Sequence, residues 1–310
     1  MTRPVVSRDM SELPGSDRRR AVTIGKFDGV HRGHRAIVSM LAGMAGSDEV
    51  TIVTFDRHPR ELLDPDCVPH SLVSLEQKIE LLGEAGADRV VVLPFTEDLA
   101  SLSHQEFSRN VLSDGLGASL VLVGRDFRYG SGGVGDVETL AAEGRELGFV
   151  VHEIPDIYET AGQRISSTMI RSLLSAGDVK KAASLLGRRP SVRSVVVHGH
   201  QRGRDLGYPT ANLANPVEGF LPADGVYATM VTVEGESYPA ATSIGVNPTF
   251  GDLTHRVVES HLLDCHLDLY GKRIEVFFVD YIRPMQKFPD GQALADQMRR
   301  DEEQIRSILL

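Results

Sequence analysis

Short apolar, β-branched runs alternate with helical patterns from Ala21 to about Leu186, and this alternation constrains the fold more than any other feature of the chain. The stretches between the runs carry apolar side chains at helical spacing. Strand candidates are residues 21–25, 50–55, 89–94, 119–124 and 149–155, and helix candidates are residues 34–45, 75–85, 104–112 and 137–147. The alternation predicts an α/β fold with a Rossmann-like, doubly wound parallel sheet. Such sheets bind ligands at the C-terminal ends of their strands.

The pattern changes after residues 187–190, where a Gly and a Pro bracket two arginines. Four β-like runs follow, separated by Gly, Pro and Asn turns, at residues 192–199, 225–233, 256–263 and 273–282. Strands at this spacing without intervening helices predict a small antiparallel β-barrel. Residues 291–310 have the pattern of an amphipathic helix docked on that barrel. We expect two domains, residues 1–187 and 188–310.

Charge and cysteine content limit the partners of the chain. The net charge of -10 and the isoelectric point near 5.6 argue against broad binding of nucleic acid or anionic membranes. Cys67 and Cys265 have neither metal-ligand nor redox spacing, which fits a reducing compartment. Apolar runs long enough for a membrane span or a signal peptide are absent. We expect a cytoplasmic protein that acts on small molecules, and a homo-oligomer is compatible with the sequence.

The segment of residues 25–34, GKFDGVHRGH, follows a predicted strand and opens a predicted helix. A helix N-terminus after a strand is a natural binding site for phosphate. Gly29 and Gly33 allow the backbone to approach a ligand, and His31 and His34, three residues apart, can face one way. Isolated histidines here would be turn or cap residues, but the combination indicates a nucleotide-phosphate site.

Two further segments of the first domain carry polar groups. Residues 123–136, VGRDFRYGSGGVGD, form a glycine-rich loop after a predicted strand, which is either a phosphate-sized loop or a long surface loop. Residues 165–171, ISSTMIR, place three hydroxyl groups at the start of a predicted helix. A hydroxyl there is commonly an N-cap, whereas Arg171, about one turn later, could clamp a phosphate.

Together the three segments resemble the nucleotidyltransferase module of the bacterial bifunctional riboflavin kinase/FMN adenylyltransferase family, also called FAD synthetase. The family elements HxGH, GxDFxFG and ISSTxIR correspond to residues 31–34, 124–130 and 165–171. The resemblance implies attack by the FMN phosphate on the α-phosphorus of ATP, with release of pyrophosphate. Because this reaction requires no enzyme nucleophile, positioning and charge stabilisation carry the rate.

The resemblance also implies roles for individual residues. Catalytic roles would fall to His31, His34 and Arg171. The ATP-binding set would be Gly25, Phe27, Asp28, His31, Gly33, His34, Asp126, Ser167, Thr168 and Arg171, and the flavin-binding set would be Phe55, His58, Asp126 and Arg128. Two positions depart from the family pattern: Arg57 stands where proline is common, and Tyr129 stands where the third aromatic motif residue is usually Phe.

The second domain carries the segments HGHQRGRDLGYPTANL, residues 198–213, and VESHLLD, residues 258–264. On a strand, Glu259 and His261 of the second segment would share one face. Taken alone, the first segment could be a turn, and Glu259 could be a solvated face residue. In this order, however, the segments resemble the riboflavin kinase module of the same family.

That resemblance implies a kinase that phosphorylates riboflavin with ATP. Glu259 would accept the proton of the ribityl 5′-hydroxyl, as a carboxylate can during phosphoryl transfer. Thr210 and Asn212 would supply hard oxygen ligands to Mg²⁺. The other implied residues are Gly203, Arg204, Gly207 and Pro209 around ATP and Arg283, together with Glu259, at the flavin. The expected whole is an enzyme that converts riboflavin to FMN and then FMN to FAD; the alternatives are a single-activity enzyme and a flavin-sensing protein.

Overall fold

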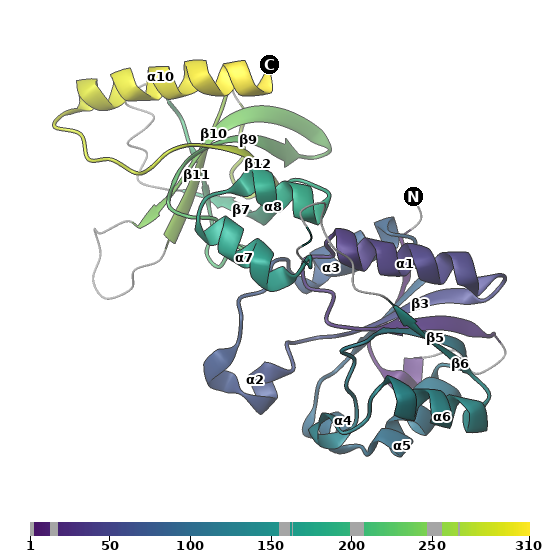
Figure 1. Cartoon of the computed structure of the whole chain (residues 1–310). Helices are drawn as coiled ribbons and strands as arrows, with labels where there is room; N and C mark the ends of the chain where they lie inside the picture. The colour runs from purple at the N-terminus through teal and green to yellow at the C-terminus, as the bar shows by residue number, and fades with distance from the viewer. Residues whose placement is uncertain are drawn as a thin grey trace. The chain divides into compact units, whose positions relative to one another are not determined.

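The computed structural model describes residues 3–12, 18–154, 162, 164–198, 208–246, 256–265 and 267–310 (Figure 1). The chain forms two compact units. The first comprises Met1–His70 and Ser74–Ser166, and the second comprises Ser71–Val73 and Ser167–Leu310. Among the residues described, no helix combines the length and the apolarity needed to cross a membrane.

The first unit contains a six-stranded sheet with the order β1-β4-β3-β2-β5-β6, in which every neighbouring pair is parallel. The strands are β1 Val5–Ser7, β2 Arg20–Ile24, β3 Glu49–Phe55, β4 Arg89–Leu93, β5 Ala118–Gly124 and β6 Val150–Ile154. This sheet confirms the predicted Rossmann-like fold. Of its strands, β1 was not predicted, because three residues give too short a pattern.

Helices cover both faces of this sheet: α1 and α3 lie on one side, and α4, α5 and α6 lie on the other (Figure 1). The helical elements are α1 Arg32–Ala45, α2 Arg60–Leu63, α3 Leu75–Glu84, α4 Glu97–Ser101, α5 His104–Glu106 and α6 Val137–Leu147, with short turns η1 Met10–Glu12, η2 Pro65–Cys67 and η4 Ser131–Gly133. The predicted helix over residues 104–112 divides into α5 and the π-helix η3 Phe107–Gly115.

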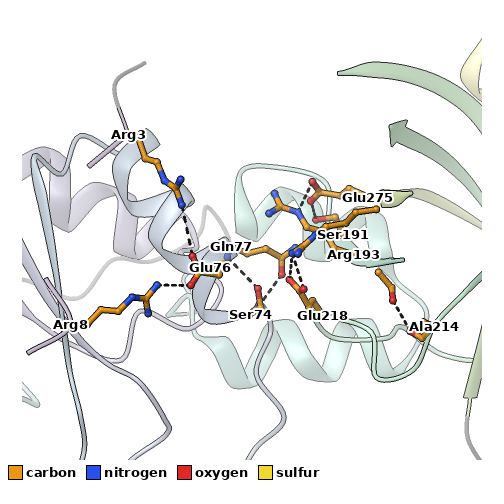
Figure 2. A network of polar contacts seen from close by, with 12 residues as sticks. Arg3, Arg8, Ser74, Glu76, Gln77, Ser191, Arg193, Ala214, Glu218 and Glu275 are labelled. Carbon is orange, nitrogen blue, oxygen red and sulfur yellow. Dashed lines mark hydrogen bonds and ion pairs between the residues drawn. The ribbon is translucent and has the colours of Figure 1, made fainter. Parts of the chain in front are cut away.

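Local sequence explains where α3 begins. The Ser74 side chain accepts a hydrogen bond from the backbone of Gln77, whose side chain accepts one from the Ser74 backbone N–H, completing a capping box (Figure 2). One residue before Gln77, the exposed carboxylate of Glu76 accepts a hydrogen bond from Arg8 at 2.6 Å (Figure 2). The capping box fixes the start of α3, whereas the exposed ion pair contributes about 0–1 kcal/mol to the free energy of unfolding.

The core of the first unit is built from β-branched residues on both faces of the sheet, and β2 and β4 are buried along their whole length. Val22, Val53, Val91 and Val121 form part of a cluster that includes Leu140 of α6. Each such side chain contributes about 1.5–3 kcal/mol when buried. The core therefore holds the C-terminal ends of β2, β3 and β5 at one edge.

A buried ionic cluster lies at the other edge of the sheet, where β2, β3 and β4 begin. One carboxylate oxygen of Glu49 accepts hydrogen bonds from Arg20 Nε at 2.9 Å and from Arg89 Nε at 3.1 Å. Arg89 also donates to Ser7 Oγ of β1. Burial alone would raise the pKa of Glu49, but the adjacent guanidinium groups lower it below its usual value. The cluster joins four strands at the edge away from the ligand-binding side.

The second unit contains a closed, six-stranded barrel with the order β10-β11-β8-β7-β12-β9. This confirms the predicted small antiparallel barrel. Its strands are β7 Ser191–Val197, β8 Ala211–Leu213, β9 Gly225–Val233, β10 Glu236–Val246, β11 Arg256–Leu262 and β12 Arg273–Arg283. On β7, Ser191 and Arg193 both bind Glu275 of β12 (Figure 2). Inside the barrel, the hydroxyl groups of Thr229, Thr242 and Ser260 form a hydrogen-bonded chain, so these buried polar groups are satisfied.

The C-terminal helix α10 Gly291–Leu309 packs on this barrel, as predicted (Figure 1). Its buried Ile305 contacts a cluster with Ala228 and Leu263. Asp301 of α10 is buried and accepts hydrogen bonds from Arg283 Nε and Nη2, the closest at 2.7 Å. An apolar contact and a buried ion pair thus attach the helix to the strands.

Helices α7 Ser167–Ser175 and α8 Val179–Leu186 belong to the second compact unit rather than the first. The Leu174 carbonyl accepts a hydrogen bond from Ala223 N, and Lys180 pairs with Asp280 of β12 at 2.7 Å. The compact units therefore divide before α7. The boundary between the two enzyme domains at residues 187–188 stays a prediction. Apolar periodicity identifies a helix but does not show against which unit its apolar face packs.

The short segment Ser71–Val73 belongs to the second unit, although the chain on both sides of it belongs to the first. The side chains of Leu72 and Val73 are buried. The Leu72 carbonyl accepts a hydrogen bond from Phe220 N at 3.2 Å. No sequence pattern predicts this excursion, because three residues carry no periodicity.

Candidate active sites

The turn between β2 and α1 places the GKFDGVHRGH segment at the C-terminal edge of the sheet, as predicted. Its backbone is sharply folded: φ is positive at Phe27, Gly29 and Val30. Positive φ is costly for a β-branched residue such as Val30, and packing must compensate for that cost. Phe27 and Val30 are both buried, so the turn is anchored by its apolar side chains.

His31 and His34 lie against each other at the start of α1. The rings stack with their centroids 3.7 Å apart, and the Phe27 ring meets His34 edge-on. His31 is the N-cap of α1, and its Nδ1 accepts a hydrogen bond from the His34 backbone N–H at 3.4 Å. Since Nδ1 accepts, Nε2 is the protonated, donating nitrogen of the neutral ring. A Cβ at Gly33 would lie 3.1 Å from the His31 ring, so a side chain there would have to displace the ring slightly.

Lys78, which the sequence analysis did not identify, lies beside the end of β3 in the candidate site. The Lys78 ammonium of α3 donates to Phe55 O at 3.4 Å and lies 3.5 Å from Thr54 Oγ1. Burial lowers the pKa of Lys78, while the carboxylates of Asp28 and Asp56 oppose that shift. The available signal was a lysine next to the buried face of an amphipathic helix.

The other flavin candidates near β3 are partly exposed. The Phe55 ring meets Phe95 edge-on at 5.3 Å. His58 Nδ1 accepts a hydrogen bond from the Arg60 backbone N–H, and the backbone N–H of His58 donates to the Glu61 carboxylate. Arg57, which stands where proline is common, contacts Asp56. The flavin roles of Phe55 and His58 stay predictions.

The glycine-rich loop after β5 carries Asp126 and Arg128 at exposed positions. Asp126 accepts a hydrogen bond from Arg164 at 2.9 Å, which ties the loop to the start of the ISSTMIR region. Two of its glycines are required by close contacts: a Cβ at Gly130 would lie 2.6 Å from the His104 backbone, and one at Gly135 would lie 2.6 Å from the Tyr129 ring. Side chains would therefore push the loop away from α5.

A partly buried carboxylate holds this loop in place. Glu143 of α6 accepts hydrogen bonds from His104 Nδ1 at 2.5 Å, Ser108 Oγ at 2.5 Å and Tyr129 OH at 2.7 Å. Burial would raise the pKa of Glu143, but these donors lower it. Tyr129 stands where the resemblance leads one to expect Phe. Its hydroxyl donates to Glu143, and a Phe at this position could not make that hydrogen bond.

The ISSTMIR segment spans the division between the compact units. Ile165 is buried and Ser166 ends the first unit, whereas Ser167, Thr168 and Arg171 lie on α7 in the second. Thr168 is exposed, and its carbonyl accepts a hydrogen bond from the Ser172 side chain within α7. The nucleotide-binding roles of these residues stay predictions.

In the second unit, residues predicted for metal and catalysis come together where β8 pairs with β11. Glu259 lies opposite Asn212 in the antiparallel register. The Asn212 side-chain nitrogen lies 3.4 Å from Thr210 Oγ1. His261, two residues after Glu259 on the same strand face, binds the Pro209 carbonyl through Nδ1 at 2.8 Å. The face therefore carries a carboxylate, an amide and a hydroxyl within one strand pair.

Other kinase candidates are placed elsewhere or not described. Gly203, Arg204 and Gly207 lie outside the described residues. Arg283 directs Nε and Nη2 to Asp301 and Nη1 to Pro284 O, and its guanidinium lies 5.7 Å from the centre of the Phe288 ring. These contacts give Arg283 a role in holding α10, and its flavin contact stays a prediction.

Comparison with known proteins adds two family matches in the order of the two modules. Residues 13–169 match the FAD synthetase family, and residues 186–309 match the riboflavin kinase family. A bifunctional riboflavin kinase/FMN adenylyltransferase of Pseudomonas fluorescens is 39% identical over 303 residues, covering 97% of this chain and 96% of the relative. The corresponding protein of Escherichia coli K12 is 39% identical over 285 residues, covering 91% of this chain and 90% of the relative.

A solved structure shares the whole architecture. It is described as a macrolide-efflux protein from Streptococcus pneumoniae, is 31% identical, and superposes with a TM-score of 0.87 over 98% of this chain and 99% of its own. The likeness supports the arrangement of a parallel sheet followed by a barrel in one chain.

Proposed function

Because the chain belongs to the family of bifunctional riboflavin kinases/FMN adenylyltransferases, we propose that it phosphorylates riboflavin to FMN and adenylylates FMN to FAD. The kinase reaction occurs in the C-terminal module and the adenylylation in the N-terminal one. The observation that carries the proposal is the presence of both modules in the family order along one chain. ATP is the co-substrate of both steps, and FMN is the product of one and the substrate of the other.

In the adenylyl transfer, an FMN phosphate oxygen forms a bond to the α-phosphorus of ATP, and the bond from that phosphorus to the bridging oxygen breaks. Pyrophosphate leaves with the bond electrons. His31 is suited to stabilise the charge on the phosphates, because its capping bond at Nδ1 directs the proton to Nε2. The N-terminus of α1 adds backbone N–H groups and a partial positive charge.

His34, Arg171 and the loop residues complete the proposed nucleotide site. We assign His34, Ser167, Thr168 and Arg171 to the ATP phosphates, and Asp126 and Arg128 to the nucleotide and flavin. Charged side chains bound to the triphosphate would orient it for in-line attack by the FMN phosphate. Lys78 of α3 joins this set as a partly buried cation beside the end of β3, next to the predicted flavin residue Phe55.

In the kinase step, the ribityl 5′-oxygen attacks the γ-phosphorus of ATP, ADP leaves, and Glu259 accepts the hydroxyl proton. The position of Glu259 opposite Asn212 brings this base beside the predicted metal ligands. A positioned general base contributes about 10²–10⁴-fold to such a step.

The donor set at this face fits Mg²⁺. Thr210 and Asn212 offer a hydroxyl and an amide oxygen, which are hard ligands of the kind that Mg²⁺ combines with water and phosphate oxygens. Among the described residues, no group of three or more His, Cys, Asp or Glu side chains could hold a metal ion, so a site shared with nucleotide phosphates suits this chain better than an all-protein cage. When bound, Mg²⁺ would neutralise phosphate charge as the phosphoryl group transfers.

Two substitutions in the full-length protein test whether the modules act independently. Glu259→Ala should lower FMN formation from riboflavin by about 10²–10⁴-fold and leave adenylylation of supplied FMN unchanged. His31→Ala should lower FAD formation by about 10²–10³-fold and leave riboflavin phosphorylation unchanged. Product formation is measured separately for each step by chromatography. Wild-type protein that yields neither FMN nor FAD from riboflavin, ATP and Mg²⁺ would refute the proposed function, and equal loss of both steps in either variant would refute separate sites.

The proposal also covers the setting of the enzyme. Both cysteines are free in the structure, with Cys67 exposed, in keeping with a cytoplasmic enzyme. Riboflavin, FMN and ATP are its partners, and neither nucleic acid nor membrane has a role in either reaction. A homo-oligomer stays an expectation to be checked by light scattering.

A further inference from the structure

His261 is the histidine of the VESHLLD segment, and neither proposed reaction uses it. It lies two residues after Glu259 on β11, where Val258, Ser260 and Leu262 point into the barrel and are buried. Glu259 and His261 therefore share the outer face of the strand. The His261 imidazole therefore lies beside the proposed kinase site, although neither reaction assigns it a chemical step.

The imidazole bonds to backbone that the strand ladder does not reach. The pairing of β11 with β8 ends with Ser260 opposite Ala211, so the next residue of β11 is His261 and the residue preceding β8 is Thr210. His261 Nδ1 lies 2.8 Å from the carbonyl oxygen of Pro209. The side chain thus continues, by one bond, the attachment of this segment to the barrel.

This bond fixes the tautomer of the ring. A carbonyl oxygen only accepts hydrogen bonds, so Nδ1 of His261 must carry the proton. The ring also meets the edge of Tyr208, with centroids 5.2 Å apart and planes at 68°. His261 therefore holds both residues that immediately precede Thr210, one through its carbonyl and the other through its ring.

Thr210 and Asn212 are the proposed magnesium ligands, and their polar groups are only loosely joined to each other. The Asn212 side-chain nitrogen lies 3.4 Å from Thr210 Oγ1 and 3.5 Å from Thr210 O. These distances are at the long limit for hydrogen bonds. Asn212 is fixed by β8, whereas Thr210 precedes that strand and depends on its neighbours for position.

We propose that His261 is a positioning residue of the kinase module, which holds Thr210 in place for Mg²⁺-nucleotide through the Pro209 carbonyl. The inference rests on the proposed kinase function. It assigns to Nδ1 a role that depends on the position of one nitrogen rather than on charge or bulk.

Asparagine and glutamine substitutions separate the two ring nitrogens. The amide nitrogen of Asn occupies the place of Nδ1, whereas that of Gln extends to the place of Nε2. His261→Asn should therefore keep the bond to Pro209, and His261→Gln should lose it. Loss of one such bond corresponds to about a five- to tenfold weaker interaction.

Calorimetric titration with ADP in the presence of Mg²⁺, and again with EDTA, reads the binding directly. His261→Gln should raise the Kd for Mg²⁺-ADP about five- to tenfold. His261→Asn should stay within about twofold of wild type, and the Kd for ADP in EDTA should change little in either variant. The KM for Mg²⁺-ATP in riboflavin phosphorylation should rise in parallel in His261→Gln, with adenylylation of FMN unchanged in the same preparation.

Three results would overturn the inference: wild-type binding in His261→Gln, equal weakening in both variants, or the same loss in EDTA as in Mg²⁺. The first would show that the bond is irrelevant, the second that the ring as a whole matters, and the third that the effect is not on the metal ligand. Failure of the wild-type protein to phosphorylate riboflavin would instead refute the proposed function.

Discussion

The Glu143 anchor offers the sharpest test of how this chain holds its glycine-rich loop. Glu143→Gln keeps the size and shape of the side chain but removes the charge and replaces one acceptor oxygen with a donor. His104, Ser108 and Tyr129 all donate to the carboxylate in the native structure. At least one of these donors would face an amide N–H in the variant.

The expected cost follows from the number and kind of these bonds. A hydrogen bond to a charged group contributes about 1.5–3 kcal/mol, and one between neutral groups about 0.5–1.5 kcal/mol. Glu143 has 13% of its side chain exposed and His104 has 25%, so solvent weakens the charge only in part. Three bonds that each lose about 1 kcal/mol, in a network that is not additive, predict a loss of about 2–3 kcal/mol in the free energy of unfolding.

The effect should depend on pH with a definite sign. The pKa of Glu143 is lowered from 4.5 in the folded protein, because its three donors outweigh burial. A lowered pKa stabilises the fold above the unfolded pKa, and that contribution is lost as the pH falls through the folded value. The difference between wild type and Glu143→Gln should therefore be full near neutral pH and should shrink below about pH 4.5.

Hydrogen exchange monitored by mass spectrometry measures this cost within the first unit, with peptides from β9 and β12 of the barrel as the internal reference. The matched control is Glu76→Gln, which removes an exposed carboxylate paired with Arg8 and should cost less than about 0.5 kcal/mol. Glu143 does not stabilise the loop through its charge if Glu143→Gln costs no more than this control, or if its cost is the same at pH 7 and pH 4.

Three further substitutions test other contacts. Glu49→Gln removes the carboxylate charge that pairs with the buried guanidinium groups of Arg20 and Arg89 and should cost about 3 kcal/mol, seen as faster exchange in β2, β3 and β4; unchanged exchange there would contradict it. Asp301→Asn should free α10 by weakening its bond to Arg283, raising exchange along that helix; a helix as protected as in wild type would argue against this anchor. Ser74→Ala removes the cap that Ser74 shares with Gln77 and should lower the free energy of unfolding by about 1 kcal/mol, measured by urea titration; no loss would mean that packing alone sets the start of α3.

The fold was largely predictable because its signals are local and repeated. Alternating strands and helices indicated the parallel sheet, and turns between β-like runs indicated the barrel. Short or atypical elements could not be predicted. For example, β10 Glu236–Val246 contains Pro239 and several small residues, so it lacks a clear apolar alternation. The compact unit against which α7 and α8 pack could not be predicted either, because it depends on packing partners distant in sequence.

The site was predictable as motifs but not as contacts. The sequence predicts the strand-to-helix turn with His31 and His34, whereas neither the stacking of the two rings nor the positive φ values of the turn follow from residue spacing. Glu143 looked like one more charged residue on an amphipathic helix, because its donors lie on α5, η3 and the loop after β5. Side-chain networks of this kind join residues that no sequence spacing relates.

The excursion of Ser71–Val73 into the second unit has a consequence for synthesis. A ribosome delivers Leu72 and Val73 long before Phe220, whose backbone N–H donates to the Leu72 carbonyl. The nascent chain must therefore carry two apolar residues that belong to a compact unit not yet translated. Such exposed apolar surface favours aggregation during folding, and chaperones act on it. Slowing translation between residues 73 and 220 should prolong the time during which this apolar segment is exposed. The yield of folded enzyme should therefore depend on the rate at which this part of the chain is synthesised.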